Sequence, residues 1–109
     1  EDALLYGAVA QGADGGILAS AHIETAEWAA VRSALLADDR GTALRRWPAL
    51  ERLARLLFSE PSPAAIKHWL WRTGLIASPE VRLPMTGVSE ALAARLDAEM
   101  AHRGVALAA

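Results

Sequence analysis

Apolar residues recur every three or four positions along most of this 109-residue chain, and that spacing predicts amphipathic helices. The pattern predicts five helices, or six, because Pro48 should either kink the third helix or divide it in two. The expected buried stripes, from the first helix to the last, are Leu4, Leu5, Ala8 and Val9; Trp28, Val31 and Leu35; Leu44, Trp47, Leu50, Leu53 and Leu57; Ile66, Trp69 and Leu70; and Leu92, Leu96 and Met100.

Capping residues mark several ends of these helices. Ser62 is expected to cap the fourth helix, with Pro63 at its first position, and Ser89 is expected to cap the last. Prolines at positions 79 and 84 exclude regular helix between those two helices. A glycine, which readily adopts the left-handed conformation that ends many helices, follows three of the stripes: Gly12, Gly74 and Gly104.

Residues 16–20 break the helical pattern. Gly15 and Gly16 introduce the apolar run Ile17–Ala19, which ends at Ser20, and this predicts one buried β-strand. A lone buried strand leaves its N–H and C=O groups unpaired. A non-alternating apolar strand between two helices is typical of a parallel sheet, so we expect its partners outside this chain, in a larger α/β unit. Pairing between copies of the chain is the alternative.

Composition narrows the possible partners. Hydrophobic residues make up 53% of the chain and the formal net charge is −2, which gives no basic footprint for nucleic acid. No apolar run approaches the roughly 20 residues that span a bilayer, so no membrane partner is expected. The absence of cysteine excludes disulfides and thiolate metal sites and is consistent with a cytoplasmic protein. The chain starts at Glu1 without an initiator methionine, so we expect it to be cut from a longer one.

Three stretches together resemble a known family. They read "GADGGILAS" (12–20), "LFSEPSPAAIKHWLWRTGLI" (57–76) and "PEVRLPMTGVSE" (79–90). In this order they resemble the C-terminal third of the dihydrodipicolinate synthase/N-acetylneuraminate lyase family, which are Schiff-base aldolases and lyases built on a (β/α)8 barrel. The resemblance implies an α/β fold class for the whole and a mostly helical chain here.

The resemblance also implies a division of the chain. Residues 1–40 would be the last βα portion of the barrel, and residues 41–109 a C-terminal helical extension. The strand at 16–20 would be the eighth barrel strand, paired with the first and the seventh. Because a whole barrel takes roughly 250 residues, most of it would lie outside this chain.

The function that the resemblance implies is that of a pyruvate-dependent Schiff-base lyase of the dihydrodipicolinate synthase type. A lysine amine forms an imine with pyruvate or another 2-keto acid, which then attacks an aldehyde. No further cofactor and no metal are expected, and the family implies a homo-oligomer, a tetramer or a dimer. The alternatives are a 2-keto-3-deoxy sugar-acid aldolase or dehydratase, N-acetylneuraminate lyase, and a non-enzymatic helical interaction module.

No catalytic residue is expected within this segment. Lys67 is the only lysine, but it begins a helix, whereas the imine lysine of the family sits on the sixth strand. We therefore interpret Lys67 as a surface or helix-packing cation. The catalytic tyrosine of the family also lies upstream, so Tyr6 is not its counterpart. The histidines at positions 22, 68 and 102 lack metal-ligand spacing.

The resemblance places up to three substrate contacts here. The backbone carbonyl of Ile17 matches the one that faces the imine and pyruvyl group in the synthases. Asp2 matches an aspartate that contacts the sugar chain in the sialic acid lyases, and Ala19 matches a serine with the same role but lacks its hydroxyl. His22 replaces an asparagine of the family. These departures argue against sialic acid as the substrate.

Overall fold

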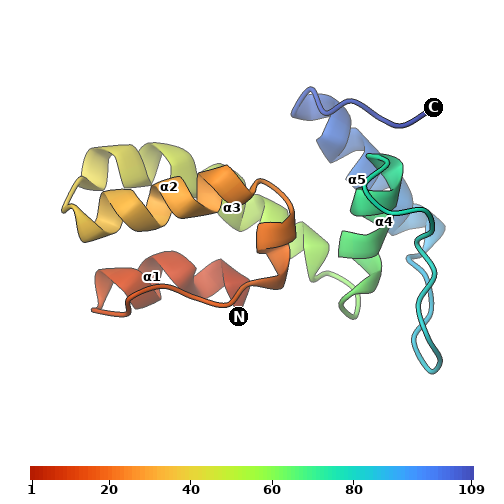
Figure 1. Ribbon diagram of the computed structural model, residues 1–109, viewed down its shortest axis with the longest axis horizontal. Coiled ribbons are helices and arrows are strands. Elements are labelled where there is room, and N and C mark those ends of the chain that lie inside the picture. The colour runs from red at the N-terminus through yellow and green to blue at the C-terminus, as the bar shows by residue number, and fades with distance from the viewer. The chain divides into compact units, whose positions relative to one another are not determined.

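A computed structural model describes residues 1–109, and all of its regular elements are helical (Figure 1). Contacts divide the chain into two compact units, residues 1–56 and residues 57–109. The five α-helices and two 3-10 turns, in chain order, are η1 (Asp2–Leu4), α1 (Leu5–Ala10), η2 (Ala19–His22), α2 (Thr25–Leu36), α3 (Arg40–Leu57), α4 (Ala64–Arg72) and α5 (Glu90–His102). The predicted number of helices is thus confirmed.

The core of the first unit forms where α1, α2 and α3 meet. Its buried members are Ala3, Leu5, Val9, Trp28, Val31, Leu50 and Ala54. The ring of Trp47 packs against this core, tilted on Tyr6 at 5.6 Å and edge-on to Trp28 at 6.0 Å between ring centroids. The helical spacing therefore identified most of the core correctly. Leu4, Ala8 and Leu44, by contrast, were expected in the buried stripes and are exposed.

Helix α3 runs through Pro48 without a break, so of the two expected effects of this proline, a kink or a division, the division does not occur. A proline inside a helix removes one backbone hydrogen bond, here the bond to the Leu44 carbonyl. Burial on both sides of the proline compensates for this loss, because Ala43 before it and Leu50 and Leu53 after it are all buried.

The second unit is built on α4 and α5. Buried side chains on these two helices include Ile66, Trp69, Leu92, Leu96 and Met100, and all five were expected from the spacing. Residues 77–89, between the two helices, contain no regular helix, as the prolines predict.

The helix ends confirm the predictions for Ser89 and the three glycines and overturn those for Ser62 and Pro63. Ser89 caps α5, since its hydroxyl oxygen accepts the N–H of Leu92 at 3.1 Å. Gly74, at φ +78°, closes α4, and the N–H groups of residues 74 and 75 bond back to the carbonyls of residues 71 and 70. Ser62 does not cap α4: the helix begins at Ala64, its N-cap is Pro63, and no side chain caps it.

The predicted strand at residues 16–20 does not form in this structure. Residues 13–18 belong to no helix or strand, and Ala19 and Ser20 already belong to η2. The backbone of Leu18 is extended, at φ −124° and ψ 124°, but no segment of the chain pairs with it. An extended segment becomes a strand only through hydrogen bonds to a neighbour, and these 109 residues supply none.

Candidate active-site segment

Two of the three sequence-predicted contacts, Ile17 and Ala19, lie between α1 and α2, and hydrogen bonds to η1 and α2 hold both ends of this stretch. We call residues 12–20 the bridging segment. At its start, Gly12 closes α1 with φ +109° and donates its N–H to the Val9 carbonyl at 3.0 Å. Arg32 on α2 then donates its Nε to the Asp14 carbonyl at 2.7 Å. A side chain of α2 therefore fixes the entry to the bridging segment.

The exit from the bridging segment is fixed by a carboxylate. Asp2 lies in η1 and is buried, and its Oδ2 accepts the backbone N–H of Ser20 at 2.7 Å. Ser20 is itself fully buried, and its carbonyl accepts the N–H of Ile23 at 2.9 Å. The Ser20 hydroxyl, in contrast, has no hydrogen-bond partner.

The middle of the bridging segment has a bare backbone. No N–H or C=O group of Gly15, Gly16 or Ile17 forms a hydrogen bond in this chain. Gly16 packs so closely that an added Cβ would lie 2.9 Å from a methyl group of Leu5, while Leu18 packs on the core of the unit. The Ile17 side chain is fully exposed, so the expectation that this run is buried is wrong for the chain by itself.

The three predicted contact residues thus lie on one local framework. Asp2 accepts a hydrogen bond from the last residue of the bridging segment, Ser20. Ile17 lies in the middle of the segment, where the backbone has no hydrogen-bond partner, and Ala19 is exposed at the start of η2. His22 is also exposed, at the end of η2. Sequence reasoning missed Arg32 and the main-chain N–H of Ser20. Neither leaves a signal in the sequence, because each contact joins residues 18 positions apart.

Lys67 lies on α4 in the second unit. Its ammonium group donates to the backbone carbonyl of Glu80, in the stretch that leads to α5. This contact joins a helix to a loop, which agrees with the interpretation of Lys67 as a helix-packing cation.

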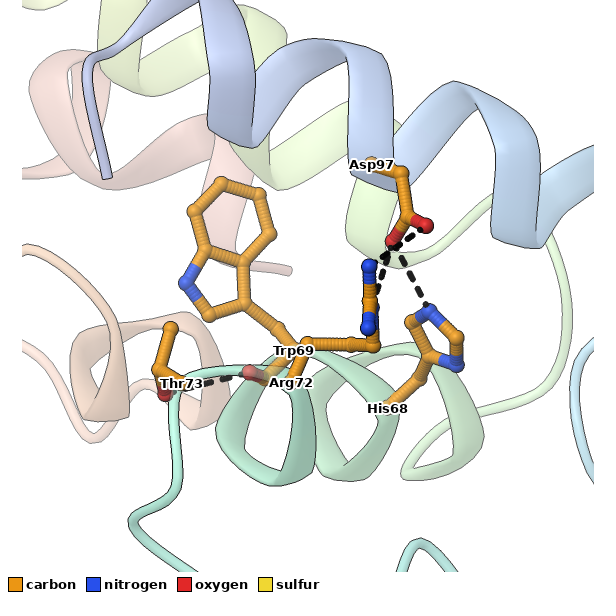
Figure 2. Close-up of polar contacts among 5 residues, drawn as sticks. All are labelled: His68, Trp69, Arg72, Thr73 and Asp97. Carbon is orange, nitrogen blue, oxygen red and sulfur yellow. Dashed lines mark hydrogen bonds and ion pairs between the residues drawn. The ribbon is translucent and has the colours of Figure 1, made fainter. Parts of the chain in front are cut away.

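A polar cluster joins α4 to α5 in the second unit (Figure 2). Asp97 on α5 accepts two hydrogen bonds from the Arg72 guanidinium, both at 3.1 Å, and lies 3.3 Å from His68 Nε2. Partial burial raises the pKa of the Asp97 carboxyl, but the hydrogen bonds from Arg72 and His68 outweigh it and hold that pKa below its ordinary value. The cluster therefore binds two helices to each other, and each of its charged groups has a partner.

The second unit also contains a cavity of about 440 Å³. Its lining residues come from α4, the 79–88 stretch and the start of α5, and include His68, Glu80, Met85 and Glu90. No group of three or more histidine, aspartate and glutamate side chains is placed to hold a metal ion. None of the helices combines the length and the apolar character needed to cross a membrane.

Comparison with known proteins places this framework in a family. A model described as the dihydrodipicolinate synthetase family matches residues 1–103. The chain belongs to this family.

Relatives and solved structures agree with that match. The chain is 42% identical over 97 residues to 4-hydroxy-tetrahydrodipicolinate synthase 2 of Clostridium acetobutylicum, which covers 89% of this chain and 34% of the relative. It is 37% identical over 105 residues to the synthase of Cereibacter sphaeroides, covering 96% and 36%. The crystal structure of dihydrodipicolinate synthase from Aquifex aeolicus superposes with a TM-score of 0.93 at 27% identity, over 100% of this chain and 37% of that one. The chain therefore spans about a third of the length of the proteins it matches.

Proposed function

We propose that residues 1–109 form the C-terminal third of a pyruvate-dependent Schiff-base synthase, which makes 4-hydroxy-tetrahydrodipicolinate or a close analogue. The observation that supports this most strongly is the family match over residues 1–103, together with relatives that are named as that synthase. A further structural neighbour, the synthase from Acinetobacter baumannii, is described as complexed with pyruvate, and it superposes with a TM-score of 0.87 at 28% identity.

In the proposed barrel, the bridging segment supplies the eighth strand. Its bare backbone at Gly15, Gly16 and Ile17 supports this assignment, because unpaired main-chain groups are costly when buried and need partners. The first and seventh strands would supply those partners, and the exposed Ile17 side chain would then be covered by the rest of the barrel.

The proposed reaction uses a lysine that lies upstream of this segment. Its unprotonated amine adds to the ketone carbon of pyruvate, and loss of water gives the imine. Loss of a proton from the adjacent methyl group gives an enamine, whose carbon attacks the aldehyde carbon of the acceptor and forms the new C–C bond. Water then releases the product and restores the lysine amine.

The contribution of this segment is a main-chain group. The Ile17 carbonyl would point its negative end at the cationic imine, so its position matters more than the identity of its side chain. Ala19 has no hydroxyl to bind a sugar chain, which favours a small aldehyde over sialic acid as the acceptor. We further propose a cytoplasmic homo-oligomer with no cofactor besides the lysine imine.

Borohydride trapping tests this proposal. The complete polypeptide that contains residues 1–109 is incubated with pyruvate, reduced and analysed by mass spectrometry. We expect one pyruvyl adduct per chain, on a lysine upstream of Glu1, and condensation activity with an aldehyde acceptor. The matched control is the 109-residue chain, in which we expect no adduct on Lys67. An adduct on Lys67, or none anywhere in the complete polypeptide, would contradict the proposal.

A further inference from the structure

The buried carboxylate of Asp2 is hydrogen-bonded to the main chain at Ser20. The residue is only 7% exposed, and its Oδ2 lies 2.7 Å from the backbone nitrogen of Ser20. A hydrogen bond from an N–H group to a carboxylate is about twice as strong as one to a neutral acceptor. This contact is therefore a strong anchor between η1 and the start of η2.

The anchor acts on the backbone of Ser20 and not on its side chain. The Ser20 hydroxyl has no partner, whereas its N–H bonds to Asp2 and its carbonyl bonds to the N–H of Ile23. Ser20 follows Ile17 by three residues, and η2, where the chain turns, starts between them. The position of Ser20 thus limits where the Ile17 carbonyl can lie.

Between Asp14 and Ser20, the bridging segment is supported by the packing of Leu18 on the core and by a hydrogen bond from the Ala21 N–H to the Leu18 carbonyl at 3.3 Å. Arg32 holds the Asp14 carbonyl before the bare stretch, and Asp2 holds the Ser20 N–H after it. Within this chain, no other hydrogen bond reaches the backbone of residues 15–17. The two anchored residues, Asp14 and Ser20, each lie three positions from Ile17, so both limit where its carbonyl can lie. Of the two anchoring hydrogen bonds, the one to Asp2 is buried and the one from Arg32 is exposed.

We propose that Asp2 is a positioning residue: its hydrogen bond with the Ser20 N–H determines where the Ile17 carbonyl lies in the active site. This inference rests on the proposed function and replaces the expected role of Asp2 as a contact to the second substrate. A buried carboxylate that already accepts a main-chain hydrogen bond fixes backbone geometry. An error of about 1 Å in such geometry can lower a rate by about a hundredfold.

Three variants of the complete polypeptide separate the two roles. Asp2→Ala removes the acceptor and leaves the Ser20 N–H without a partner. Asp2→Asn keeps an oxygen that can accept the Ser20 N–H but removes the negative charge. It replaces the alanine variant in the test if that variant does not fold. Asp14→Asn is the control, because Asp14 is an exposed acid of the same segment and only its main-chain carbonyl is in use.

The readouts are the rate of borohydride-trappable imine formation with pyruvate, the KM for the aldehyde, and hydrogen exchange of the Ser20 amide. We expect Asp2→Ala to form the imine about ten- to a hundredfold more slowly and to exchange the Ser20 amide at least about tenfold faster. Asp2→Asn should show the same changes at a few-fold level, and Asp14→Asn should match the unaltered protein. The half-reaction with pyruvate is decisive, because a contact to the second substrate would leave it unchanged.

Two outcomes overturn the inference. One is an Asp2→Ala variant that forms the imine at the unaltered rate, with or without a raised aldehyde KM. The other is a Ser20 amide that exchanges equally fast in all four proteins. Failure of the proposed function looks different, since the unaltered polypeptide itself would then form no imine with pyruvate.

Discussion

The bridging segment and the α4–α5 pair differ in where their polar groups find partners. In the α4–α5 pair, Asp97 binds Arg72 and His68, Ser89 caps its own helix, and each helix buries an apolar stripe. In the bridging segment, both ends are anchored but the middle has no partner within the chain. The polar groups of the α4–α5 pair thus find partners within the chain, whereas the backbone groups in the middle of the bridging segment do not. This difference is what the proposed barrel assignment requires: a helical unit whose polar groups pair within the chain, and a segment whose proposed partners lie outside it.

The largest loss of stability is expected from a cavity-forming substitution in the core of the second unit. Leu96 on α5 is fully buried, so Leu96→Ala should lower the free energy of unfolding by about 2–5 kcal/mol through lost contacts and the cavity left behind. The control is Leu83→Ala, at a side chain that is 91% exposed, where we expect less than about 0.5 kcal/mol. Urea denaturation of both variants measures the difference. Equal values would show that the second unit does not depend on this core.

Ile17→Ala sharpens the comparison, because its effect should depend on the rest of the barrel. In the 109-residue chain the side chain is exposed, and we expect a change below about 0.5 kcal/mol. In the complete polypeptide the same substitution should cost about 2–4 kcal/mol, as for a buried isoleucine. Thermal or urea unfolding of both lengths gives the answer. A small effect in both would mean that nothing covers Ile17, and the assignment as a barrel strand would be wrong.

The N-cap of α5 should make a smaller contribution to the stability of the second unit. Ser89→Ala removes the oxygen that accepts the Leu92 N–H and should destabilise the second unit by about 1 kcal/mol. Ser89→Thr retains a hydroxyl at the same place and should recover most of this loss. Denaturation midpoints of the two variants should therefore differ. If they coincide, the cap observed at α5 makes no net contribution.

The smallest expected effect is a loss of folding stability at low pH, when Asp97 becomes protonated. The pKa of Asp97 is lowered in the folded state, so the charged carboxylate stabilises the fold above its ordinary pKa of about 3.8, and this contribution is lost as the pH falls through the lowered value. Because Asp97 is more than a third exposed, we expect no more than about 1 kcal/mol after solvent screening. Asp97→Asn should be less stable than the unaltered chain at pH 7, and this difference should shrink as the pH falls below 3.8 and through the lowered pKa. A constant difference between pH 7 and pH 3 would contradict this account.

Local signals in the sequence predicted the helical unit well. Glycine at positions 74 and 104, serine at position 89 and the spacing of the apolar residues each act within a few residues of the structure they determine. The error at Ser62 has a local cause as well, since Pro63 occupies the N-cap position and provides no side-chain acceptor. The survival of α3 through Pro48 has a tertiary cause, because burial on either side outweighs the lost bond.

The bridging segment could be predicted only in part, because its structure depends on distant groups. Its apolar, glycine-led composition indicated a strand, but a strand requires a neighbour that this chain does not provide. The contact of Asp2 with Ser20 joins residues 18 positions apart and leaves no local pattern. Family membership therefore rests on the comparisons and not on an observed strand.

Hydrogen exchange at the amides of Gly15, Gly16 and Ile17 tests most directly whether their partners lie outside this chain. Mass spectrometry would compare the 109-residue chain with the complete polypeptide, using the α5 amides as an internal reference that should be protected in both. We expect residues 15–17 to exchange freely in the short chain and at least about a hundredfold more slowly in the complete one. Equal exchange of these three amides in the two proteins would contradict the account.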